Sequence, residues 1–163
     1  MTSAALIYST IAAMIPSVAC TQSNSSFPQD LAIQQANLII TARLVSFSIP
    51  ESQVGANQPS SLILNIKPVA SLKGVPPQDL QIFWEGGTER QFVKLKNQEV
   101  LVGIVQNDPA KVQMFGPTYF ASLQGYPEAN LPWVLNSFCA PPFLFSQKQD
   151  AALFESAMRA LRD

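Results

Sequence analysis

The fold is decided by the stretch LIITARLVSFSI, which spans residues 38–49. Its apolar residues at positions 38, 40, 42 and 44 alternate with other side chains, which is the pattern of a β-strand with one face in a core. Phe47 and Ile49 continue the alternation one residue out of phase. A bulge or strong bend near Val45 and Ser46 would account for that slip. The sequence therefore predicts a long, bent strand to which the other strands are fitted.

Four further strands are predicted downstream, at residues 62–72, 80–84, 99–105 and 133–138. The strand at 99–105 is almost wholly apolar, as expected of a strand that is buried on both faces. Between the third and fourth strands, Phe92 to Lys96 is predicted to be a short extended or looped piece. Residues 107–132 are rich in proline and glycine turn signals and are predicted to be a long excursion from the sheet.

Two helices frame these strands. A short one is predicted at residues 30–37, with Asp30 as its N-cap. A second is predicted near the C-terminus, with Ser146 as N-cap and Gln149 in a capping box. Its apolar stripe would dock onto the sheet; the stripe consists of Leu153, Phe154, Ala157, Met158 and Leu161. Its polar side would face out; that side carries Asp150, Glu155, Arg159 and Arg162. The predicted fold class is α+β, mainly β: a five-stranded OB-fold-type closed barrel with a short N-terminal helix and a C-terminal amphipathic helix.

The first 29 residues contain no charged side chain. An apolar run over residues 6–15 is broken by Pro16, and small residues stand three and one positions before Cys20. This is the layout of an export signal with cleavage after Ala19. We therefore expect an export signal peptide at 1–19 and a single domain at 20–163, placed outside the cell, in a periplasm or anchored to an envelope.

The composition excludes several classes of function. With a net charge of −1 and ten Lys plus Arg, the chain has no basic surface for nucleic acid. It has no histidine and two cysteines, which removes His-based catalytic triads and dyads and thiolate or imidazole zinc sites. No glycine-rich nucleotide-binding motif is present. We therefore expect no enzyme, no cofactor and no metal site.

The acidic side chains are expected to be solvated surface charges rather than a pair of catalytic carboxylates. The group comprises Glu51, Asp79, Glu85, Glu89, Glu99, Asp108 and Glu128.

Several segments, taken in order, carry a family resemblance. They are Cys20-Thr21, the run ANLIITARLV at 36–45, ASLKG at 70–74, EVLVG at 99–103, VLNSFCAPP at 134–142 and Leu153-Phe154. In order and spacing they resemble the tissue inhibitors of metalloproteinases, within the broader netrin-like OB-fold class. The resemblance covers residues 20–163. The chain would be a divergent, cysteine-poor member, because the loop after the third strand has no cysteine and Gln22 replaces another.

The resemblance implies a mode of action. The free α-amine and carbonyl of Cys20 would chelate the zinc of an extracellular metalloprotease, and Thr21 would fill the pocket beside the scissile bond. The loop Glu85-Gly86-Gly87-Thr88 would flank them. A disulfide between Cys20 and Cys139 would hold this edge rigid, and closing so long a loop contributes about 4–5 kcal/mol through the unfolded state.

Cys20 also has a second interpretation. Ser17-Val18-Ala19-Cys20 approximates the box that precedes a lipidated cysteine. Lipidation would turn the sulfur into a thioether and acylate the amine, so neither a disulfide nor zinc chelation could form. The protein would then be an envelope lipoprotein, in contact with a membrane only through that lipid. A secreted protein-binding module without inhibitory activity is the related alternative.

Overall fold

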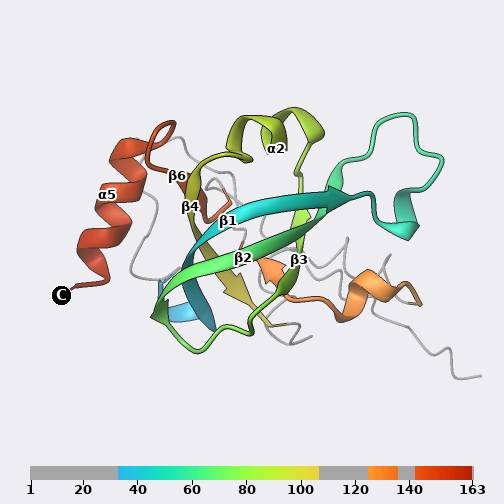
Figure 1. Ribbon diagram of the computed structural model, residues 1–163. Helices are drawn as coiled ribbons and strands as arrows, with labels where there is room; N and C mark the ends of the chain where they lie inside the picture. The colour runs from blue at the N-terminus through green and yellow to red at the C-terminus, as the bar shows by residue number, and fades with distance from the viewer. Residues whose placement is uncertain (1–32, 107–124, 136–141, 163) are drawn as a thin grey trace, which may run out of the picture.

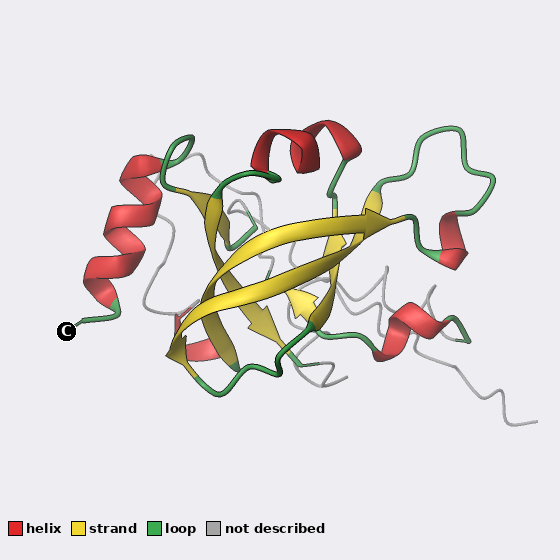
Figure 2. Ribbon diagram, viewed as in Figure 1, coloured by secondary structure: helices red, strands yellow, loops and turns green. Residues whose placement is uncertain are grey.

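The computed structural model describes residues 33–106, 125–135 and 142–162, and this part of the chain is mainly β. The elements in chain order are β1 (Leu38–Ser48), the 3-10 helix η1 (Glu51–Gln53), β2 (Ser61–Lys73), β3 (Leu80–Glu85), α2 (Glu89–Leu95), β4 (Glu99–Val105), the 3-10 helix η2 (Pro127–Asn130), β5 (Trp133–Val134), β6 (Leu144–Ser146) and α5 (Ala151–Ala160). Figure 1 and Figure 2 show β1 and β2 as a long twisted ribbon across the front, with α2 above it and α5 at the left.

The six strands form one sheet in the order β1-β2-β3-β5-β4-β6, and β1 also pairs with β4. The pairings therefore run from β1 through β2, β3, β5 and β4 and return to β1. All are antiparallel except the pairing of β3 with β5, which is parallel. The strand β6 pairs with the first half of β4, and β5 pairs with the end of β4. Each predicted strand is present; of the fifth, predicted at 133–138, Trp133 and Val134 form β5 and residues 136–138 lie outside the described residues.

The bulge predicted near Val45 is confirmed. Leu44 is paired with Ile66 and Ser46 with Asn65, so Val45 is an extra residue on β1. Two further register shifts occur earlier in the β1–β2 ladder. Because a bulge bends a strand and increases its twist, β1 can follow β2 along its whole length while its first half pairs with β4.

The strand β4 is buried on both faces, as its sequence predicts, and it separates two apolar clusters. Val100, Val102 and Ile104 belong to the first cluster, which gathers the inward side chains of β1, β2 and β3. Leu101 and Val105 belong to the second, which lies under α5 and includes Phe83, Phe143 and Phe145. After the exposed Glu99, β4 carries no polar side chain, because both of its faces meet a core.

The C-terminal helix is confirmed, but it begins later than predicted. Asp150, not Ser146, occupies the N-cap position of α5, and Ser146 is the last residue of β6. The Ser146 hydroxyl accepts a hydrogen bond from the Gln149 N–H at 3.0 Å, and the Asp150 carboxylate accepts one from the Ser146 N–H at 3.3 Å. The polar signal therefore caps the turn that leads into α5, and Asp150 is partly buried in that turn rather than fully solvated.

The apolar stripe of α5 docks onto the sheet as predicted. Ala157 is completely buried, and Leu153, Phe154, Met158 and Leu161 pack against the second cluster. None of the helices in the described ranges is long and apolar enough to cross a membrane.

Two elements differ from the prediction. Residues 89–95 form α2, where an extended or looped piece was expected for Phe92 to Lys96. The strand β6 was not predicted; it is three residues long and pairs with Val100, Leu101 and Val102 of β4. In the short helix expected at 30–37, residues 33–35 are helical and the predicted cap at Asp30 lies outside the described residues.

Candidate functional site

The described part of the predicted site is the loop Glu85–Thr88, which connects β3 to α2 (Figure 1). Cys20 and Thr21, predicted to chelate and to fill a protease pocket, lie outside the described residues. Cys139, the predicted disulfide partner of Cys20, also lies outside the described residues. The geometry of the site is therefore the geometry of this loop and of the surfaces beside it.

Two glycines set the path of the loop. Gly86 has a φ of 74°, in the left-handed region that glycine adopts most easily, and its N–H donates to the carbonyl of Ser60 at 2.8 Å. Gly87 is buried against Trp84, and a Cβ at this position would overlap the indole ring. The Gly87 N–H donates to the Trp84 carbonyl at 3.3 Å. The loop thus turns sharply and is held against the sheet.

Thr88 ends the loop as the N-cap of α2. Its hydroxyl oxygen accepts a hydrogen bond from the Gln91 N–H at 3.3 Å, and the Gln91 carbonyl oxygen Oε1 accepts one from the Thr88 N–H at 2.9 Å. This reciprocal capping box satisfies two backbone donors at the start of the helix. The signal for α2 was in the sequence, because a threonine followed three residues later by a glutamine is the signature of such a box.

Glu85 begins the loop and is partly buried at the end of β3, opposite Ser61 of β2. Burial raises the pKa of its carboxyl group above the ordinary value of 4.5. The described residues hold no group of three or more histidine, cysteine, aspartate or glutamate side chains that could bind a metal ion. Within these ranges Glu85 is therefore not part of a group that could hold a metal ion.

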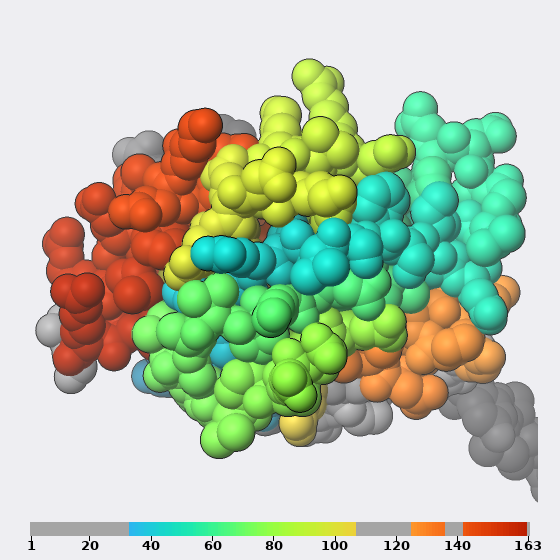
Figure 3. All heavy atoms as spheres, in the orientation of Figure 1, coloured from blue at the N-terminus to red at the C-terminus, as the bar shows by residue number. Residues whose placement is uncertain are grey.

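A groove of about 590 Å³ lies beside the loop. One wall is apolar and consists of Phe47 and Ile49 at the end of β1, with Phe47 packed on Phe92 at 4.8 Å between ring centroids. The other wall is the start of α2, where Thr88 and Arg90 line the groove. Figure 3 shows α2 and the segment after β1 standing on either side of the end of β1. The groove therefore has one apolar wall and one polar wall.

Glu128 corrects one sequence prediction. The sequence predicts a solvated surface charge, but Glu128 is only 1% exposed to solvent. Its carboxylate accepts a hydrogen bond from the Ser52 backbone N–H at 2.8 Å. Burial alone would raise the pKa of Glu128, but the hydrogen bonds from Ser52 and neighbouring backbone groups outweigh it and lower the pKa below 4.5. The buried charge is accommodated because it is hydrogen-bonded.

The sequence matches no model of a known protein family, and no curated protein is significantly similar to it.

Proposed function

We propose that the sheet is a closed barrel of the OB-fold type, with β6 and α5 added on one side. The return of the pairings from β4 to β1 supports this, because closure removes the two free edges of the five-stranded unit. The parallel pairing of β3 with β5 brings the start of the loop at Glu85 near β5. A barrel of this kind presents its loops as a binding surface.

On this barrel we propose an exported, non-enzymatic, netrin-like binding protein that inhibits an extracellular zinc metalloprotease. Cys20, freed at its amine by signal cleavage, would coordinate the protease zinc through its α-amine and carbonyl oxygen. Thr21 would enter the neighbouring specificity pocket, and the loop from Glu85 to Thr88 would contact the rim of the protease cleft. No cofactor and no metal ion of its own is required.

The single observation that carries this proposal is that hydrogen bonds hold the loop from Glu85 to Thr88 in one conformation. Its backbone is held by Ser60, Trp84 and Gln91 before any partner arrives. A loop that is already in one conformation loses little conformational entropy on binding, which is what an inhibitor of a preformed cleft needs. The adjacent groove enlarges the surface that a protease rim could contact.

The first test is the intact mass of the mature exported protein, with and without reductant. The inhibitor proposal expects cleavage after Ala19, no added lipid, and a gain of two hydrogens on reduction as the bond between Cys20 and Cys139 opens. The mature protein should then inhibit a panel of zinc metalloproteases. A matched variant with one alanine added before Cys20 should not inhibit, because its amine is moved away from the zinc. Equal inhibition by both forms would overturn the proposed chelation.

The box Ser17-Val18-Ala19-Cys20 favours a second function, that of an envelope lipoprotein. In that case the mass would carry a diacylglyceryl group and an acyl chain, and Cys139 could not be bonded to Cys20. An unlipidated protein that inhibits no metalloprotease would instead indicate a secreted binding module that uses the loop and the groove alone.

A further inference from the structure

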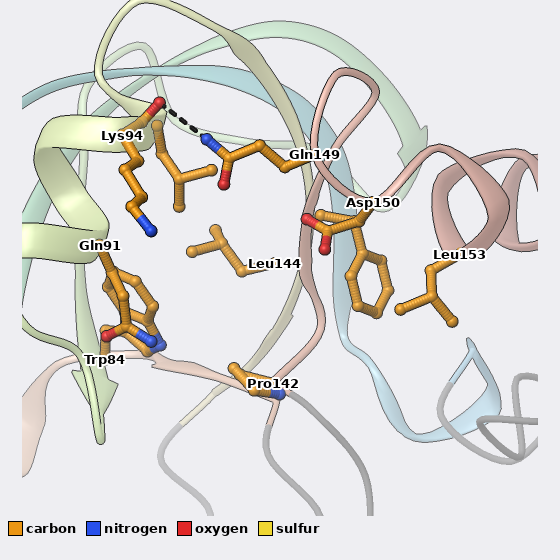
Figure 4. A pocket seen from close by; sticks show the side chains of 10 residues that line it. Trp84, Gln91, Lys94, Pro142, Leu144, Gln149, Asp150 and Leu153 are labelled. Atoms are coloured by element: carbon orange, nitrogen blue, oxygen red, sulfur yellow. Dashed lines mark hydrogen bonds between the residues drawn. The ribbon is translucent and has the colours of Figure 1, made fainter. Parts of the chain in front are cut away.

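A second pocket, separate from the groove, lies between α2, β6 and the start of α5 (Figure 4). Its volume is about 210 Å³, which is room for a molecule of a few carbon atoms. Trp84 and the α2 residues Gln91 and Lys94 form one side. Leu144 and Leu153 provide apolar surface, and Asp150 lies on the far side.

The indole of Trp84 supplies a buried donor to this pocket. The residue is 3% exposed, and its Nε1 has no hydrogen-bond partner among the described residues. In Figure 4 the ring lies beside Gln91 with its nitrogen toward the pocket. A buried N–H without an acceptor is unfavourable, so an acceptor atom that enters the pocket gains an unusually good partner.

Two further donors lie on the same side. The Gln91 Oε1 atom already accepts hydrogen bonds from the Thr88 N–H at 2.9 Å and the Thr88 hydroxyl at 2.8 Å. Its orientation is fixed by that capping box, which leaves the amide nitrogen Nε2 as the group available to the pocket. Lys94 adds an ammonium group that extends into the pocket in Figure 4. An indole N–H, an amide N–H and a positive charge together favour a carboxylate.

The far side of the pocket restricts the ligand further. Gln149 Nε2 donates to the Lys94 carbonyl at 3.1 Å and so bridges α2 to the turn before α5. The Asp150 carboxylate accepts a hydrogen bond from the Ser146 N–H and lies across the pocket from Lys94. Its negative charge disfavours a second acidic group there, and Leu144 between the two sides favours an apolar body.

We propose that this pocket binds a small monocarboxylate with a short apolar body. Its carboxylate accepts hydrogen bonds from Trp84 Nε1 and Gln91 Nε2 and pairs with the Lys94 ammonium, while its body contacts Leu144, which lies between these donors and Asp150. The site uses neither Cys20 nor the exposed surface of the loop, although Trp84 and Gln91 also hold that loop in place.

The test uses the two tryptophans of the chain as reporters. In 15N-labelled protein they give two indole N–H signals, which a Trp84→Phe variant assigns. Titration with sodium isovalerate should move the Trp84 signal along a saturable curve and leave that of Trp133 nearly unchanged. Isoamyl alcohol and isoamylamine have the same body without the carboxylate, and neither should produce that shift.

Variants separate the site from general ligand adsorption. Lys94→Met should weaken isovalerate binding about tenfold or more, since hydrogen bonds to charged groups are the strong ones. Lys96→Met removes a charge two residues away, outside the pocket lining, and should leave the affinity unchanged. Lys94 and Lys96 are both exposed, so neither substitution disturbs the core. The two indole N–H signals show whether each variant is folded. A Trp84 signal that does not saturate, or equal affinities in the two lysine variants, would overturn the proposal.

Discussion

The carboxylate of Glu128 accepts a hydrogen bond from the backbone N–H of Ser52 at 2.8 Å, across 76 positions of the chain. The bond joins η2, just before β5, to η1, in the connection between β1 and β2. One buried charge therefore ties η2, whose Ala129 packs on the second apolar cluster, to η1. Since η1 has no buried residue, the carboxylate is a principal anchor of that segment.

Glu128→Gln should lower stability at neutral pH, by about 1–3 kcal/mol, because a charged acceptor becomes a neutral one. The pKa of Glu128 is lowered in the folded protein, so its contribution is complete above the ordinary value of 4.5 and is lost as the pH falls through the folded-state pKa. Urea unfolding of wild type and variant at several pH values measures the difference. Glu155→Gln, an exposed helix position, is the control. A difference that did not shrink in acid would contradict the role of the charge.

Glu85 should behave in the opposite sense. Burial raises the pKa of its carboxyl group, so the ionised form is disfavoured in the folded protein and its cost grows as the pH rises from 4.5 through the folded-state pKa. Glu85→Gln should therefore raise the melting temperature at pH 7 and leave it unchanged in acid. Asp79→Asn, an exposed change just before β3, should show no such pattern. A lower melting temperature at pH 7 for Glu85→Gln would refute the prediction.

The strands β1 to β4 could be predicted because each leaves a local pattern in the sequence. The phase slip after Leu44 even located the bulge at Val45, since a side chain that changes face must be preceded by an extra residue. The unbroken apolar run of β4 indicated its two cores in the same way. The bulge and the apolar run can both be read from the sequence, because each depends only on which faces of a single strand are buried.

The rest of the fold depends on partners far along the chain. β6 has three residues and exists because β4 offers it backbone groups, which no local pattern records. Glu128 is buried because Ser52 approaches it, and a carboxylate in a loop otherwise indicates a surface charge. For the site, the sequence predicts a loop directly after the third strand, and the structure shows that the Thr88–Gln91 capping box fixes the end of that loop. The pocket at Trp84 could not be predicted, because its lining comes from α2, β6 and α5, which are far apart in the sequence.

Gly103 is a position where only glycine fits. It lies in the middle of β4 under the ring of Phe143, and a Cβ there would overlap that ring. The Gly103 N–H also donates to the Phe143 carbonyl at 2.9 Å, so the two backbones cannot separate without losing a bond. Gly103→Ala should destabilise the protein by about 1–3 kcal/mol, the usual cost of overpacking a core.

The pair Gly103 and Phe143 can be tested as a cycle. Phe143→Leu alone should destabilise by leaving a cavity, but in the Gly103→Ala background it should cost less, because the smaller side chain makes room for the new methyl group. Denaturant unfolding of the four proteins gives the interaction energy. Additive effects would show that the ring does not restrict position 103.

Thr88 links the stability of α2 to the shape of the candidate site. Thr88→Ala removes the hydroxyl that accepts from the Gln91 N–H and should cost about 1 kcal/mol, the typical value of an N-cap. The Gln91 side chain would keep only its bond from the Thr88 N–H and lose the one from the hydroxyl, so amide exchange at Gly86 and Gly87 should accelerate. Thr88→Ser keeps the cap and should preserve both stability and exchange.

The same pair of variants tests whether loop order matters for binding. If the loop from Glu85 to Thr88 contacts a protease rim, Thr88→Ala should weaken inhibition by more than Thr88→Ser, because the alanine variant must pay the ordering cost on association. Inhibition constants of the two mature variants, compared with their exchange rates, provide the measurement. Faster exchange in Thr88→Ala with an unchanged inhibition constant would exclude the loop from the contact and leave Cys20 and Thr21 as the only inhibitory elements proposed.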